Sequence, residues 1–175
     1  AVLNSKEFGV PQSRPRRYVI GIANVVPGHN DFKWPDAVPM PQLLSIMQPD
    51  LPFMPTAALP QGITAQRNAR LAHERLCSLP CGTLAVVSLS ASKQRPEIRI
   101  GVSGCITRAR AGDTAGRCGM WWVRKTPEGF CVWRQITLIE IARLQGWPDL
   151  ITSAIMQDLP ARSHLLALGN GFTFC

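Results

Sequence analysis

Gln12-Ser-Arg-Pro-Arg16-Arg-Tyr-Val-Ile-Gly-Ile22 is the stretch on which the expected fold of this sequence depends. One proline directly before it and one within it disfavour helix at the residues that precede them. In the extended chain that results, alternate side chains share a face, so Gln12, Arg14 and Arg16 form one row. That row offers an amide and two fork-shaped guanidiniums, which suit a flat oxygen-bearing group or a phosphate. On this stretch alone, a polar binding row and an ordinary basic loop are equally good interpretations.

Outward from this row, apolar patterns predict the main elements. The run Tyr18-Val-Ile-Gly-Ile22 predicts a buried strand that anchors the row. A helix is expected from Thr64, because Ala65, Ala69, Ala72 and Leu76 form one apolar stripe. Strands are expected at residues 84–89, 98–102, 120–123 and 129–133, with the last two paired. We expect Trp121, Trp122 and Trp133 to pack in the core rather than to stack on bases.

The segment after these strands has the clearest helix signals in the chain. Thr137-Leu-Ile-Glu140 is a capping box, in which the hydroxyl and the carboxylate satisfy free amides of the first turn. Gly146 suits the end of this helix, and Pro148 prevents it from continuing. A second, weaker helical pattern lies within residues 150–168.

Composition narrows the class of protein. The chain has 175 residues, 46% of them hydrophobic, which is enough for a packed core and excludes wholesale disorder. Its net charge of +8 is compatible with a phosphate-bearing partner. No apolar run is long enough to span a membrane, so we expect no membrane partner. The six cysteines lack a disulfide-like or metal-ligand spacing, which indicates reduced thiols in an intracellular protein and no metal site.

Three segments together resemble one enzyme family. Residues 3–21 resemble the Gln-x-Arg-x-Arg motif, the eighth motif of cytosine-5 DNA methyltransferases. Residues 134–149 are similar to the ninth motif, and Ala167-Leu-Gly-Asn-Gly-Phe172 is similar to the start of the tenth. The three occur in the family's order, with a long variable stretch between the first two.

The resemblance implies an α/β fold in three parts. Residues 1–24 would end a Rossmann-like catalytic domain that depends on S-adenosyl-L-methionine. Residues 25–133 would form a small, irregular, mainly β target-recognition region, and residues 134–175 would return to the catalytic domain. Double-stranded DNA would lie between the two domains, in a bacterial cytoplasm or a eukaryotic nucleus.

The resemblance also implies residue roles. Arg16 would donate to O2 of a flipped cytosine, with Gln12 and Arg14 lining the same catalytic cleft. Asn170, between Gly169 and Gly171, would close the pocket for cofactor and cytosine. Charge and position alone indicate DNA contacts at Arg108, Arg110, Lys93 and Arg95. Arg134 is a further DNA-binding candidate, although fixing the ninth-motif helix is the role that we favour for it, as for Glu140 and Arg143.

The family motifs that hold the cofactor and the nucleophilic cysteine precede the eighth motif, and this sequence does not contain them. We therefore expect the chain to act with an amino-terminal catalytic part, in the same chain or as a separate subunit, and to be inactive alone. Cys81 follows a proline, but it lies after Arg16 in the chain, which argues against a nucleophilic role. Two alternatives stay open: a non-catalytic DNA-binding remnant, and a tRNA methyltransferase of the same fold.

Overall fold

The computed structural model describes residues 1–60, 62–92, 97–106, 119–158, 160, 163 and 167–168. Its strands are β1 (Val2–Asn4), β2 (Pro15–Arg17), β3 (Met54–Pro55), β4 (Leu84–Ser88), β5 (Glu97–Ile100), β6 (Met120–Lys125) and β7 (Cys131–Gln135). Its α-helices are α1 (Ile63–Cys77), α3 (Leu138–Arg143) and α4 (Asp149–Asp158). Short 3-10 helices are η1 (Ser5–Glu7), η2 (His29–Asp31), η3 (Leu43–Ile46) and η4 (Thr56–Ala58).

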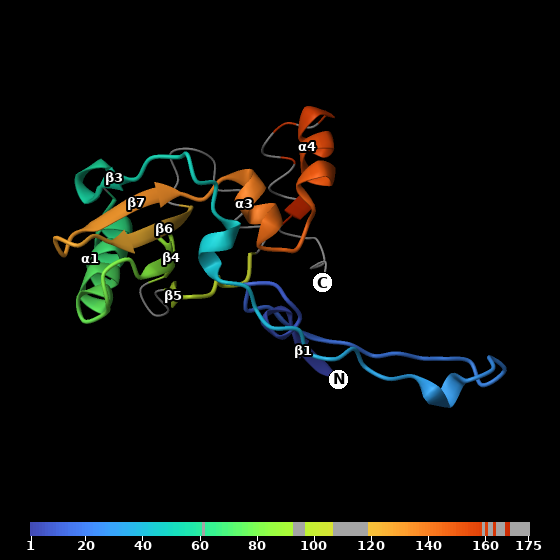
Figure 1. Cartoon of the computed structure of the whole chain (residues 1–175). Coiled ribbons are helices and arrows are strands. Elements are labelled where there is room, and N and C mark those ends of the chain that lie inside the picture. The colour runs from blue at the N-terminus through green and yellow to red at the C-terminus, as the bar shows by residue number, and fades with distance from the viewer. Residues whose placement is uncertain are drawn as a thin grey trace.

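The main sheet of the described chain has five antiparallel strands in the order β3-β7-β6-β4-β5 (Figure 1). The predicted pairing of residues 120–123 with 129–133 is confirmed, with Val123 opposite Trp133. This sheet lies within the expected recognition region except for the last two residues of β7, Arg134 and Gln135. The described chain is therefore mixed α/β with a mainly β centre.

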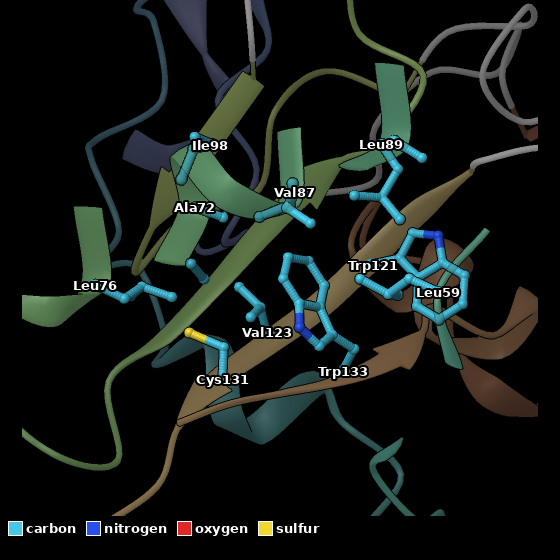
Figure 2. Packing of buried hydrophobic residues seen from close by; sticks show 13 residues of the cluster. Leu59, Ala72, Leu76, Val87, Leu89, Ile98, Trp121, Val123, Cys131 and Trp133 are labelled. Carbon is cyan, nitrogen blue, oxygen red and sulfur yellow. The ribbon is translucent and has the colours of Figure 1, made fainter. Parts of the chain in front are cut away.

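One face of the sheet packs against α1 (Figure 2). Alternate residues of the strands point to this face, and Val87, Val123 and Trp133 are fully buried there. The helix contributes its predicted stripe, Ala65, Ala69, Ala72 and Leu76. Burial of this apolar surface is the main driving force for folding of the sheet onto the helix.

The opposite face of the sheet packs against α3 and η3. Trp122 is fully buried on this side, together with Val86 from β4 and Leu144 from the end of α3. The capping box is confirmed: the Glu140 amide donates to the Thr137 hydroxyl, and the Thr137 amide donates to the Glu140 carboxylate. All three tryptophans of β6 and β7 pack in the core, as predicted.

The amino-terminal part is a separate two-stranded sheet. β1 and β2 pair antiparallel, with Leu3 opposite Arg16. The prediction of a buried strand at residues 18–22 is wrong. The ladder ends at Arg17, and Val19 keeps 90% of its surface exposed because, among the described residues, no strand pairs with it. Residues 18–40 instead extend away from the main sheet as a long excursion of the chain (Figure 1).

Within the described part of the chain, no helix combines the length and the apolar character that crossing a bilayer requires.

Candidate functional site

The row Gln12, Arg14 and Arg16 runs from the interior to the surface of the protein. Gln12 is fully buried, Arg14 is 6% exposed, and Arg16 is exposed on β2. Asn4 helps to hold the row, because its side-chain oxygen accepts a hydrogen bond of 2.9 Å from the Arg14 amide. The row is therefore not a basic loop in bulk solvent, because its first two side chains are buried, and its role in binding a partner stays a prediction.

A segment from the far end of β5 runs beside this row. Gln12 and Ser103 form a parallel bridge, in which the Ser13 amide donates to the Ser103 carbonyl and the Ser103 amide donates to the Pro11 carbonyl, both at 2.8 Å. Continuing this register places Cys105 next to Arg14. The chain thus brings part of the expected recognition region directly against the Gln-x-Arg-x-Arg row.

Side-chain contacts extend this alignment toward the surface. The Arg14 guanidinium donates from Nη1 to the carbonyl of Ile106 at 3.2 Å. Arg16 donates from Nη1 to the carbonyl of Pro15 at 2.8 Å and from Nη2 to the sulfur of Cys105 at 3.5 Å. The exposed Arg16 thus lies beside the half-buried thiol of Cys105.

Burial and neighbouring charges both change the pKa of Arg14. Removal of its guanidinium from water lowers the pKa of Arg14, and the positive charge of Arg16 lowers it further. The nearby Cys105 and Tyr18 act in the opposite direction on this pKa. Arginine stays protonated throughout the physiological range, so Arg14 is a buried permanent cation at the inner end of the row.

Gln12 has the least satisfied polar side chain of this row. Both its amide nitrogen and its amide oxygen are buried and make no hydrogen bond within the described part of the chain. Leaving a buried polar group unpaired costs about 1–3 kcal/mol. A ligand with a donor and an acceptor edge would recover that cost only if the side chains around Gln12 moved aside, because Gln12 is 0% exposed.

Arg134 is part of a buried ion pair. Its guanidinium donates to the Glu140 carboxylate at 2.6 and 3.1 Å, and both side chains are almost fully buried. Glu140 also accepts hydrogen bonds from the Trp122 indole at 2.8 Å and from the Gln48 amide at 2.7 Å. The proposal of Arg134 as a DNA contact is therefore corrected: this guanidinium is committed to the junction between β7 and α3, as our favoured alternative has it.

The electrostatics of Glu140 follow from the same contacts. Burial raises the pKa of the Glu140 carboxyl, but hydrogen bonds from Arg134, Thr137, Trp122 and Gln48 outweigh it and leave this pKa below its ordinary value. At the outer end of α3, Arg143 pairs with Asp149 at 2.6 Å and donates to the Ile46 carbonyl. Both arginines within residues 134–149 thus have structural partners.

Several predicted site residues lie outside the described residues. They are Lys93, Arg95, Arg108, Arg110, Gly169, Asn170 and Gly171. Their proposed roles in binding DNA or cofactor stay predictions. Cys81 is exposed on the turn between α1 and β4, and its sulfur lies 3.8 Å from the carbonyl of Pro127. Within the described ranges, no group of His, Cys, Asp and Glu residues is arranged to hold a metal ion.

Sequence reasoning did not identify Ser103 and Cys105 as neighbours of the row. The contact joins residues about ninety positions apart, so no local pattern could have revealed it. The comparisons with known proteins add no family: no family model, curated protein or solved structure matches this chain.

Proposed function

We propose that this chain is the carboxy-terminal part of a cytosine-5 DNA methyltransferase, and that it supplies the cytosine-binding row and the target-recognition region. In this proposal the small amino-terminal sheet joins a Rossmann-like domain, and the five-stranded sheet carries the recognition surface. The observation that carries the proposal is the row itself. A buried amide, a buried guanidinium and an exposed guanidinium follow one another along one edge of the chain.

This order of groups suits a flipped cytosine. The Watson–Crick edge of cytosine carries an amino donor and two acceptors, N3 and O2, which match an amide and guanidiniums. During methylation at C5, a thiolate adds at C6 and negative charge develops toward O2 and N3. A guanidinium on O2 stabilises that charge, which is the role proposed for Arg16, with Gln12 and Arg14 fixing the base. The cofactor S-adenosyl-L-methionine supplies the methyl group and would be bound mainly by the amino-terminal part.

Transfer of a labelled methyl group tests the proposal. The chain is mixed with an amino-terminal part that carries the nucleophilic cysteine, labelled S-adenosyl-L-methionine and double-stranded DNA. We expect label in the DNA only when both protein parts are present. DNA binding without transfer, for every amino-terminal part tried, would favour the non-catalytic remnant. Label in tRNA but not in DNA would favour the tRNA enzyme.

A further inference from the structure

Residues 18–40 carry most of the large apolar side chains that the described chain leaves exposed. Of the eighteen such side chains among the described residues, ten lie in this excursion: Tyr18, Val19, Ile20, Ile22, Val25, Val26, Phe32, Trp34, Val38 and Met40. The excursion extends away from the main sheet, so neither core cluster covers it (Figure 1). A concentration of exposed apolar side chains of this kind marks a surface that binds another molecule.

A hollow of about 510 Å³ opens on the same excursion. Two aromatic rings of its lining, Phe32 and Trp34, pack edge to face with their centroids 5.2 Å apart. The rest of the lining is Ala1, Tyr18, Val19, Ile20, Ile22, His29 and Asn30. The chain's own side chains thus leave room beside residues 18–22 for apolar groups of another molecule.

The backbone of residues 19–22 has no partner either. Tyr18 still continues the small sheet, because its amide donates to the Ala1 carbonyl at 2.9 Å and its carbonyl accepts from the Ala1 amino group at 3.0 Å. Beyond Tyr18, no hydrogen bond joins the amides and carbonyls of residues 19–22 to any described residue. A segment that continues a strand with free backbone groups is a template for pairing with another chain.

We propose that this surface is the contact between two copies of this chain, in which residues 18–22 of one copy pair antiparallel with residues 18–22 of the other. The sequence of the segment is complementary to itself. Antiparallel pairing centred on Ile20 sets Ile20 opposite Ile20, Tyr18 opposite Ile22 and Val19 opposite Gly21. Tyr18, Ile20 and Ile22 of both copies then form one apolar ladder across the pair.

The positions of the charges are compatible with this register. Arg17 would face Ala23 of the second copy, and Arg16 would face Asn24, so no two cations lie directly opposite each other. Pairing centred between Arg16 and Arg17 would instead set these cations against one another. The net charge of +8 repels two copies at long range while the contact itself is apolar, so added salt should strengthen the association.

The size of the contact predicts a weak dimer. From their exposed fractions, the apolar side chains of residues 18–22 and 32–34 offer on the order of 500 Å² per copy. A standard protein–protein interface buries about 800 Å² per partner, so this contact belongs to the weak class. We therefore expect a monomer at about 10 μM and a dimer toward about 1 mM. This inference does not rest on the proposed function, because the chain contains every residue that it uses.

Sedimentation equilibrium of the full chain measures the association. The apparent mass should be 19.2 kDa at about 10 μM and should approach twice that value at about 1 mM. The increase should be larger in about 0.5 M salt than in about 0.05 M salt. A chain that stays monomeric throughout this range would overturn the proposal. A dimer that dissociates in salt would overturn it as well, because its contact would be ionic.

Matched lysine variants locate the contact. Ile20→Lys sets two like charges against each other at the centre of the pair and should weaken association at least about tenfold. Val25→Lys is the control, because Val25 is 83% exposed in the same excursion but lies outside the paired segment. It adds the same charge and should weaken association much less. Equal effects of the two variants would mean that net charge decides the association, and the proposal would fail.

A crosslink tests the register. With Ile20→Cys, mild oxidation by oxidised glutathione should join two chains through position 20, because the two side chains at this position lie opposite each other. Val25→Cys, treated in the same way, should give far less of the corresponding crosslink. Peptide mass spectrometry identifies the joined positions. Dimers joined only through native cysteines would place the contact elsewhere and contradict the proposal.

The two-part methyltransferase assay separates this inference from the proposed function. If the chain alone stayed monomeric and Ile20→Lys weakened its assembly with an amino-terminal catalytic part, the surface would bind that part, and the assignment to a second copy would be wrong. Methyl transfer without a dimer would keep the proposed function and overturn this inference. A dimer with the expected register, but without transfer for any amino-terminal part, would do the reverse.

Discussion

Arg134 and Arg16 differ in their burial and in the groups that their guanidiniums contact. Arg134 is buried and donates to both oxygens of Glu140, whose carboxylate is also bound by an indole and by two backbone amides. Arg16 is exposed, and its described contacts are a backbone carbonyl and a thiol. A guanidinium with an internal carboxylate stabilises structure, whereas one that forms no ion pair with a described residue retains its charge for an external anion.

The contrast extends to the surroundings of each arginine. The Arg134 site joins β7 to α3 beneath the packed face of the main sheet, where Trp122 is fully buried. The row that contains Arg16 lies between the small sheet and residues 103–106. Stability should therefore respond to changes at the first site, and ligand binding to changes at the second.

Removing the Glu140 charge should give the largest effect. Glu140→Gln leaves the Arg134 cation buried without its counter-charge, which costs about 3–5 kcal/mol in free energy of unfolding. Urea denaturation followed by tryptophan fluorescence measures this loss. Glu74→Gln is the matched control, because Glu74 is paired with Arg70 on the exposed surface of α1, and it should cost at most about 0.5 kcal/mol. Similar losses for both variants would erase the contrast between buried and exposed pairs.

Removing the Arg16 charge should affect transfer and spare the fold. If the proposed function holds, Arg16→Gln should lower the rate of methyl transfer in the two-part assay by about 10²–10³-fold, because one donor to the developing charge is lost. Its free energy of unfolding should change by less than about 0.5 kcal/mol, as is usual for exposed side chains. Arg70→Gln should leave transfer unchanged. If Arg16→Gln unfolded the chain, Arg16 would be a residue that stabilises the fold, as Arg134 is.

A pair of valines sharpens the comparison between the two sheets. Val87 is fully buried in the main sheet, and Val19 follows the small sheet with 90% of its surface exposed. Val87→Ala should destabilise the chain by about 2 kcal/mol, from lost burial and the cavity left behind. Val19→Ala should have little effect on the isolated chain. A comparable loss at Val19 in the same urea titrations would show that residues 18–22 are buried in solution.

Of the four predictions, acidification should give the smallest change in stability. The folded pKa of Glu140 lies below its ordinary value of 4.5, so its contribution to stability is complete above that value and is lost as the pH falls further. The wild-type urea midpoint should therefore fall on going from neutral pH to about pH 3, and Glu140→Gln should show a weaker fall. Asp149, whose pKa is lowered by its hydrogen bond to Arg143, titrates in both chains, so their difference reports Glu140. Parallel curves would contradict this assignment.

The sequence predicted most of the local structure correctly. The stripe of α1, the capping box of Thr137 and Glu140, and the hairpin of β6 and β7 all follow rules that act over a few residues. The failure at residues 18–22 has a physical reason as well. An apolar run indicates that burial is favourable, but the run becomes a strand only where another strand pairs with it.

The candidate site, too, could be predicted from the sequence only in part. Alternation in an extended chain predicts one row for Gln12, Arg14 and Arg16, and the guanidiniums of the two arginines do lie beside residues 105–106. It gave no information on their burial, on the neighbouring Cys105, or on the partner that occupies Arg134. Those features depend on contacts between residues far apart in the chain, where chain connectivity imposes no spacing.

The amino-acid sequence by itself determined the apolar stripe of α1, the capping box at the start of α3, the pairing of β6 with β7, and how much positive charge the chain carries. Only the tertiary structure decided which of the arginines meets a carboxylate and which meets a thiol. The physical reason is that periodicity and capping act within a few residues, whereas burial and the pairing of charges depend on which distant segments pack together.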